Sequence, residues 1–375
     1  MKRICFFVIL VLWAVSCIQP KVQNSAGNNL LTSDTIRYAQ GFTVHHFDGY
    51  TAVEVRDPWD STRLLQRYLL VDRERPVPGN LPKGTVVRVP ARNIVVYTSV
   101  HAAIIDQLGE TGRIIGVCEP RYMDTPAIQE GLKAGRIADM GEATAPNVEM
   151  MIDKGAELVI VSPFQNSGYG PVEKLGIPIL EGADYMESLP LGRTEWIRFY
   201  GMLFGKEALA DSIFRQTEKN YLDLKRLVKA DMPRPTVISE KKFGASWFMP
   251  AGDSYIANMY ADAGADYVFK ELPGAGSTPL AFETVLDRAI HADMWLVKYN
   301  RSEDMTYGDL RAEYTPYENF DAFKNRRIYS CNTGLVPYYE EFPLHPDYLL
   351  KDLIWVFHPE LLPGYTPRYY RKMQD

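Results

Sequence analysis

Two glutamates occupy matching places in a phrase that this sequence uses twice. Glu149 begins the run Glu-Met-Met-Ile-Asp-Lys, and Glu283 begins the run Glu-Thr-Val-Leu-Asp-Arg, each shortly before an apolar stretch. Both copies predict a short helix, a tight turn and a buried strand. A carboxylate in the first turn of a helix is favoured by up to about 1 kcal/mol by the helix dipole and stays solvated. Two such carboxylates on similar lobes are suited to grip a partner at two points, although ordinary helix-start acids would give the same pattern.

The elements around the two phrases alternate between strand and helix. Ile94–Tyr97 and Ile114–Val117 have the pattern of buried strands, and His101–Leu108 has the pattern of a helix. The alternation resumes at Thr236 and ends with a helix over Leu344–Phe357. Strands that alternate with helices predict mostly parallel sheets with helices layered on them. We therefore predict an α/β fold.

A long helical pattern lies between the two alternating regions. It runs from Thr194 to Val228, with a break expected near Gly205. Because this stretch is longer than a typical helix, we expect a stiff connector that limits the lobes to small relative movement. Two packed surface helices of one lobe remain the alternative.

The region before Pro90 has a different pattern. Alternating apolar residues from Ile36 onward predict strands, and Asp48-Gly49 predicts a hairpin turn. We therefore expect a strand-rich extension laid onto the first lobe. The predicted boundaries are a signal peptide at 1–16, a flexible tether at 17–33, the extension at 34–90, the first α/β lobe at 91–192, the linker helix at 193–230, the second α/β lobe at 231–362 and a tail at 363–375.

The amino terminus predicts export and lipidation. Lys2 and Arg3 precede an apolar run, and small residues precede Cys17. Cys17 stands where lipoprotein signals place the cysteine that is acylated, and several acyl chains give stable membrane attachment. The alternative is nearby cleavage with Cys17 incidental. We expect a chain anchored by lipid in the cell envelope, on the periplasmic face.

Composition excludes some classes of function. Loss of Lys2 and Arg3 with the signal leaves 39 basic against 47 acidic residues, a net charge of −8 where the full chain has −6. An acidic chain without basic runs argues against nucleic-acid binding. Cys118 and Cys331, the cysteines beyond Cys17, cannot form a disulfide framework, so we expect buried thiols.

Several short motifs, taken in order, resemble those of a known family. They are Arg113-Ile-Ile-Gly-Val, Pro146-Asn-Val-Glu, Ala156-Glu-Leu-Val-Ile, Lys174-Leu-Gly-Ile-Pro, Leu203-Phe-Gly-Lys, Ala263-Gly-Ala and Phe357-His-Pro-Glu. Over roughly residues 92–362 the chain resembles the substrate-binding lipoproteins of ABC importers for iron complexes and cobalamin. The resemblance implies two Rossmann-like α/β lobes joined by a long interdomain helix, with the ligand in the cleft between them. It also implies that Glu149 and Glu283 dock onto arginines of a permease dimer, which works with an ATPase. Ala281 departs from the family because a serine cap is common there.

The ligand of such a cleft would meet the loops that follow the strands. Candidate contacts in these loops are Tyr97, Ser99, Arg121, Tyr122, Tyr169, Trp247, Phe248, Tyr299 and Arg301. Because aromatic residues outnumber charged ones, a corrinoid suits the set, and a loop around Tyr169 is similar to one in hydroxamate-siderophore binders. A catecholate complex would need several convergent basic residues, for which Arg121, Lys241, Lys242 and Arg301 are candidates. Each aromatic residue is also compatible with an ordinary place in the core.

Other chemistries find less support in the sequence. Haem remains an alternative ligand, with His101, Tyr97 or Tyr169 as axial candidates. Six scattered histidines give no spacing for a bare metal site, so we expect no resident metal or cofactor. No phosphate loop, nucleophile elbow or His-Glu-Xaa-Xaa-His motif is present, so we expect no enzyme. A lipid-anchored hydrolase and an adhesin or scaffolding lipoprotein are the rival classes.

Overall fold

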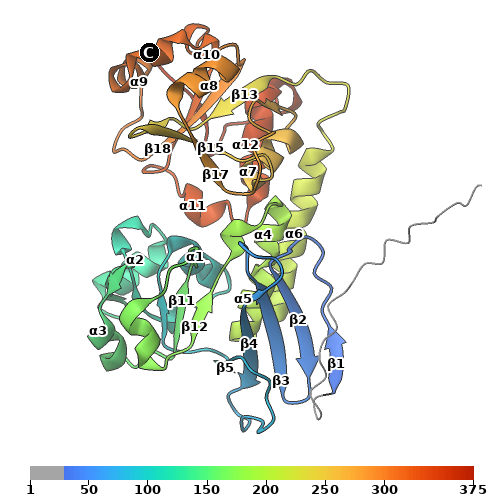
Figure 1. The fold of residues 1–375 in the computed structure, drawn as a ribbon, viewed down its shortest axis with the longest axis vertical. Coiled ribbons are helices and arrows are strands. Elements are labelled where there is room, and N and C mark those ends of the chain that lie inside the picture. Colours follow the sequence, from blue (N-terminus) through green and yellow to red (C-terminus); the bar gives the residue numbers. More distant parts are fainter. Residues whose placement is uncertain (1–28) are drawn as a thin grey trace, which may run out of the picture.

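The computed structural model describes residues 29–375. The predicted signal peptide, Cys17 and most of the predicted tether lie outside the described residues. Figure 1 shows two lobes, one above the other, with a sheet of antiparallel character beside the lower lobe and a long helix along one side. This arrangement confirms the predicted fold class of two α/β lobes, an interdomain helix and a strand-rich N-terminal extension.

The extension is a five-stranded sheet in sequence order. Its strands are β1 (Leu30–Ser33), β2 (Phe42–Phe47), β3 (Tyr50–Arg56), β4 (Leu64–Asp72) and β5 (Thr85–Val89). The first four pair antiparallel and β5 pairs parallel to β4. The predicted turn joins β2 to β3, and Gly49 adopts a φ of 84°, which glycine tolerates without strain. One face of this sheet packs on the Trp196–Leu203 region and shares the N-terminal core.

The N-terminal lobe is a parallel sheet with short helices around it. The strand order is β12-β11-β6-β7-β8, with β6 (Ile94–Val96), β7 (Ile114–Val117), β8 (Ala138–Asp139), β11 (Leu158–Val161) and β12 (Ile179–Glu181). The helices are α1 (Ser99–Gln107), α2 (Pro126–Lys133), α3 (Val148–Asp153) and the 3-10 helices η1 (Thr111–Arg113), η2 (Pro120–Tyr122), η3 (Gly170–Leu175) and η4 (Asp184–Met186). A small antiparallel pair, β9 (Gly141–Glu142) and β10 (Ala145–Pro146), precedes α3.

The C-terminal lobe repeats this plan. Its main sheet has the order β16-β13-β18-β19-β20, with β13 (Thr236–Ser239), β16 (Asp266–Tyr267), β18 (Met294–Tyr299), β19 (Ile328–Asn332) and β20 (Arg371–Lys372), where β20 alone pairs antiparallel. A second sheet holds β14 (Lys242–Phe243), β15 (Ser246–Pro250) and β17 (Ser277–Leu280). The helices are α7 (Tyr255–Asp262), α8 (Phe282–Ala289), α9 (Tyr307–Glu313), α10 (Asp321–Lys324), α11 (Tyr338–Glu341), α12 (Pro346–Phe357) and the 3-10 helices η5 (Thr315–Asn319) and η6 (Pro359–Leu361).

Three consecutive helices join the lobes. They are α4 (Pro190–Glu195), α5 (Ile197–Phe204) and α6 (Glu207–Lys225). The predicted break is confirmed, because Gly205 ends α5 in the left-handed region with a φ of 66°. The buried residues of α6, Ala210, Phe214, Thr217 and Tyr221, recur every three or four positions and form one face. That face packs against α5 of one lobe and α12 of the other (Figure 1).

Buried carboxylates clamp the extension onto these helices. Glu195 is fully buried and accepts the backbone N–H groups of Arg37, Tyr38 and Ala39 at 2.7–3.1 Å. Glu187 accepts those of Gln40 and Gly41 in the same way, together with the Trp196 indole N–H. Hydrogen bonds to an ionised acceptor are stronger than neutral ones, so this clamp fixes the extension as a brace on the linker.

The same device orders the carboxyl terminus. Asp352 of α12 accepts the backbone N–H groups of Arg368, Tyr369 and Tyr370 and the Tyr365 hydroxyl. Tyr369 and Tyr370 are 1% exposed. The predicted tail is therefore folded into the C-terminal core.

Replacing Glu195 by Gln should destabilise the protein strongly. The neutral amide keeps the shape but weakens three charge-assisted hydrogen bonds inside the fold, so we expect a loss of about 3 kcal/mol in the free energy of unfolding. Urea unfolding followed by circular dichroism measures this loss. Glu130→Gln, at an exposed position of α2, is the matched control and should change stability by less than about 0.5 kcal/mol. Equal stability of the two variants would contradict the clamp.

Candidate functional site

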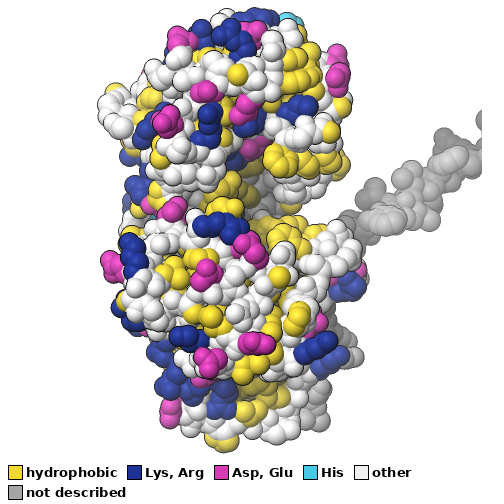
Figure 2. Space-filling view, turned by 90° about the vertical axis from the view of Figure 1, so that its left-hand side faces the viewer, with side chains coloured by type: hydrophobic (Ala, Val, Ile, Leu, Met, Phe, Trp, Pro, Cys, Tyr) yellow, Lys and Arg dark blue, Asp and Glu magenta, His cyan; other side chains and the backbone are white. Residues whose placement is uncertain are grey.

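The two lobes meet at the carboxyl ends of their strands. Helix α11, which follows β19, packs on α1, which follows β6. Lys298, near the end of β18, has its ammonium 5.7 Å from the ring centre of Tyr338 in α11. Figure 2 shows the surface hollowed between the lobes on this side. Ligands of α/β proteins bind outside the carboxyl ends of strands, so this interlobe cleft is the candidate site.

Arg193 of α4 joins the lobes inside the cleft. Its Nε donates to Asp184 Oδ2 at 3.1 Å, and Asp184 Oδ1 lies 3.2 Å from His101 Nε2. Its guanidinium carbon lies 4.9 Å from the ring of Phe342 and 5.4 Å from that of Tyr255, both in the C-terminal lobe. Burial acts to raise the pKa of Asp184, but the hydrogen bond from His101 and the charge of Arg193 outweigh it and lower that pKa. The carboxylate therefore stays ionised and holds Arg193 against both lobes.

A second contact between the lobes lies at α11. Glu340 accepts the backbone N–H groups of Asp124 and Thr125 at 2.8 and 3.1 Å, and the Thr125 hydroxyl at 3.0 Å. Thr125 is the N-cap residue of α2 and makes no capping bond with its own side chain. A carboxylate of one lobe thus caps a helix of the other at its positive end. The two lobes are therefore in direct contact at α11, beside the hollow.

Buried polar groups lie beneath α11. Lys298 forms an ion pair with Glu240 at the end of β13. Burial acts to lower the pKa of Lys298, but the negative charge of Glu240 raises it well above its usual value, so the pair stays charged. The hydroxyls of Ser239, Tyr260 and Tyr338 are buried near the carboxyl edge and have no hydrogen-bond partner among the described residues. On the side of the C-terminal lobe, polar groups therefore lie beneath the aromatic ring of Tyr338 in α11.

The ligand candidates of the N-terminal lobe fall into two groups. Ser99 lies in the first turn of α1, and Tyr97 is buried beside it, with no partner for its hydroxyl within residues 29–375. Arg121 and Tyr122 are exposed on η2, where Arg121 binds both oxygens of Glu142 at 2.6 and 2.9 Å. Tyr169 is half-buried, and its hydroxyl donates to Glu181 at 2.7 Å. These residues border the carboxyl edge, but their polar groups do not converge on one point.

The candidates of the C-terminal lobe require one correction. Trp247 has no exposed surface and donates its indole N–H to the Ser239 carbonyl, so the predicted ligand contact is wrong. Strand alternation in β15 turns Trp247 into the core and leaves the next residue, Phe248, 43% exposed. Tyr299 is buried, and its hydroxyl accepts the Met305 N–H. Arg301 remains 42% exposed at the cleft end of β18.

The geometry limits haem and metal chemistry. His101 is fully buried and bonded to Thr98 and Asp184, so neither ring nitrogen is free for iron. Within the described part of the chain, no group of three or more His, Cys, Asp or Glu side chains is arranged to hold a metal ion.

The two repeated glutamates are exposed at helix starts, one in each lobe. Glu149 lies in the first turn of α3, which Asn147 caps by accepting the Met150 N–H at 2.9 Å. Glu283 lies in the first turn of α8, where Ala281 makes no side-chain cap. In Figure 1, α3 and α8 both lie away from α6.

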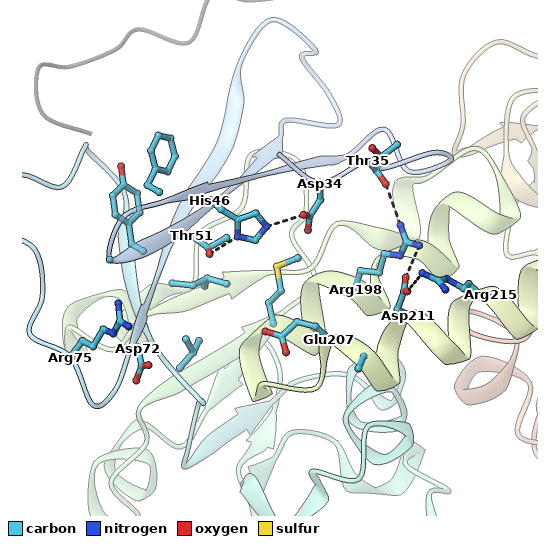
Figure 3. Close-up of a pocket in the computed structure, with 17 residues that line it drawn as sticks. Asp34, Thr35, His46, Thr51, Asp72, Arg75, Arg198, Glu207, Asp211 and Arg215 are labelled. Carbon is cyan, nitrogen blue, oxygen red and sulfur yellow. Dashed lines mark hydrogen bonds and ion pairs between the residues drawn. The ribbon is translucent and has the colours of Figure 1, made fainter. Parts of the chain in front are cut away.

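A cavity of about 800 Å³ lies outside the cleft. Residues of the extension sheet and of α5 and α6 line it, as Figure 3 shows. Some of its polar side chains pair with each other: His46 with Asp34 at 2.8 Å, and Arg198 with Asp211 at 2.8 Å. No sequence pattern predicted this cavity, because its walls come from two segments, residues 34–89 and 198–215, that are more than 100 residues apart.

Comparison with known proteins supports the two-lobe fold. Residues 94–333 match the family described as periplasmic binding protein. An uncharacterized lipoprotein of Methanocaldococcus jannaschii is 26% identical, over 98% of this chain and 94% of its own length. That alignment spans the extension as well as both lobes.

Solved structures share the fold at low sequence identity. A protein of an ABC-type Fe3+-hydroxamate transport system from Saccharomonospora viridis has a TM-score of 0.56 at 18% identity, covering 72% of this chain and 94% of its own. The periplasmic vitamin B12 binding protein of Vibrio cholerae has a TM-score of 0.54 at 12% identity, covering 71% and 96%. Both likenesses concern the fold.

Cys118 and Cys331 should resist thiol reagents in the folded protein. Both are fully buried, and burial raises the pKa of each thiol to about 12. At pH 8 the thiolate fraction is then on the order of 10⁻⁴, so a disulfide reagent should react only after unfolding. In a chain that starts at residue 17 and carries Cys17→Ser, so that Cys118 and Cys331 are its only thiols, we expect no rapid release of chromophore under native conditions and two equivalents in denaturant. Rapid native reaction of either thiol would contradict the burial.

Proposed function

Because this chain belongs to the periplasmic binding protein family, we propose that it captures a metal chelate between its lobes and delivers it to an ABC importer permease. The observation that carries the proposal is the meeting of two α/β lobes at the carboxyl ends of their strands, with α4–α6 joining them. A cleft of this kind places a ligand against loops from both lobes. The proposed ligand class is a ferric siderophore or cobalamin, and we propose no catalytic role.

Charge within the cleft favours a neutral chelate. Arg121 is bound by Glu142, Lys241 by Glu313 at 2.7 Å, and Lys298 by Glu240. Arg301 lies 3.8 Å from Asp309. A triply charged catecholate would need several basic groups without acidic partners. Hydroxamate siderophores and corrinoids fit this balance better. Haem receives less support, because His101 and Tyr169 already hold hydrogen bonds and Tyr97, the third axial candidate, is buried.

The proposed location is the cell envelope, on the periplasmic face, with a lipid on Cys17. Two observations support it: the signal-like residues before Cys17 and the lipoprotein relative. Among residues 29–375, no helix is long and apolar enough to cross a membrane. Acyl chains on Cys17 would then supply the attachment.

Glu149 and Glu283 are the proposed docking carboxylates for the permease dimer. Each is exposed, makes no side-chain hydrogen bond or ion pair with another described residue, and lies at the start of a helix in its own lobe. Carboxylates so placed would meet basic residues of two permease subunits, steer association and fix its register.

Changing both residues to Ala should separate transport from binding. We expect uptake of the bound chelate to fall by at least about tenfold while the affinity of the purified chain changes less than about twofold, because neither residue lines the cleft. Uptake by cells that carry only the variant, and calorimetric titration, measure the two quantities.

A matched double variant controls for the loss of two exposed glutamates. Glu130→Ala with Glu271→Ala removes one exposed glutamate from each lobe and should leave uptake unchanged. Normal uptake by the Glu149→Ala, Glu283→Ala variant would contradict the docking assignment.

A further inference from the structure

A loop of the extension shares a small pocket with the first lobe. The β3–β4 loop supplies Trp59 and Arg63, and the loop after β11 supplies Phe164 to Ser167. The pocket has a volume of about 180 Å³. That volume is smaller than a site for a whole drug-sized ligand, which is roughly 300–1,000 Å³, so it suits one substituent of a larger molecule.

The extension loop is held in shape before any ligand arrives. Asp57 is 8% exposed, and its Oδ1 accepts the backbone N–H groups of Trp59 and Asp60 at 2.9 and 3.2 Å. Its Oδ2 accepts Arg63 Nη2 at 2.7 Å. One buried carboxylate thus fixes both the turn and the arginine. Preorganisation of this kind lowers the entropy lost on binding.

The pocket lies at the carboxyl edge of the N-terminal sheet. Tyr68 of β4 accepts the backbone N–H of Glu181, the last residue of β12, at 2.7 Å. Pro163, in the pocket wall, accepts the hydroxyl of Tyr185. Tyr185 follows Asp184, which binds the interlobe Arg193. The pocket wall is therefore linked, through Pro163 and Tyr185, to the Asp184–Arg193 pair next to the interlobe contact.

We infer that the β3–β4 loop forms a third wall of the ligand cleft, in which Trp59 and Arg63 contact a neutral amide or hydroxamate group of the chelate. This inference rests on the proposed function and assigns the extension a part in ligand selection. Trp59 and the 65% exposed Phe164 offer apolar faces, while Gln165, Asn166 and Ser167 offer donors and acceptors.

Charge in the pocket sets the ligand class. Asp57 and Asp60 balance the guanidinium of Arg63, with Asp60 Oδ2 3.0 Å from its Nε. Glu181 adds a further acidic group to the lining. No excess positive charge remains for a polyanion, whereas Arg63 Nη1 still has N–H groups to donate to a carbonyl oxygen.

The test is calorimetric titration of the mature chain in detergent with three probes: cyanocobalamin, a ferric trihydroxamate and the anionic ferric enterobactin. We expect Trp59→Ala and Arg63→Ala each to weaken binding of a neutral probe by at least about tenfold. Arg75→Ala is the matched control, because Arg75 is an exposed arginine of the same extension that lines the 800 Å³ cavity instead. It should change affinity by less than about twofold.

Hydrogen exchange of the wild-type chain gives a second readout that does not depend on variant folding. Bound neutral probe should slow exchange in residues 57–65 and 163–167. This inference is overturned if the Trp59 and Arg63 variants bind with unchanged affinity. It is also overturned if a wild-type chain that binds a chelate shows no protection of residues 57–65. Either result leaves the proposed function standing. Binding of ferric enterobactin alone overturns the ligand class. A wild-type chain that binds none of the probes overturns both proposals.

Discussion

Two buried carboxylates, Glu187 and Glu195, fix the arrangement on which the rest of this protein depends. Together they accept the backbone N–H groups of residues 37–41, where the extension crosses the helices that join the lobes. A buried carboxylate that lacks hydrogen-bond donors carries a large cost in free energy. Displacing residues 37–41 would remove these donors, so the segment stays bound to the helices. Once it is clamped, Tyr68 reaches the edge strand β12, and the β3–β4 loop lies against the loop after β11.

Several contacts between the lobes are polar, and they suggest how ligand capture and release would proceed. Glu340 accepts charge-assisted hydrogen bonds from the other lobe, and Arg193, held by Asp184, places its guanidinium against the rings of Phe342 and Tyr255. Such bonds can be exchanged for water or ligand groups at small cost, in contrast to an apolar interface. The 19-residue α6 packs on both lobes and restrains large rotations. The expected motion is therefore a small opening around α11.

Sequence patterns predicted the fold well because its signals are local. The hydrophobic pattern changes from alternating residues in the extension to alternating strands and helices in the lobes. Asp48-Gly49 forms the turn between β2 and β3, and Gly205 separates α5 from α6. The site was harder to predict. Trp247 follows a strand end as expected, yet the pairing of β15 with β17 turns it inward. Glu340 binds Thr125 from 215 residues away, and Trp59 and Phe164 line one pocket from loops of two separate sheets, so neither arrangement has a pattern along the chain.

The most direct measurement is native mass spectrometry of the purified mature chain, titrated with a ferric trihydroxamate, cyanocobalamin and haem. If the lobes enclose one chelate, each chain should gain the mass of one molecule of one of these compounds. Binding should saturate at one equivalent, and the chelate should be recovered unchanged. Absence of any retained chelate, or chemical conversion of the compound during incubation, would contradict the account.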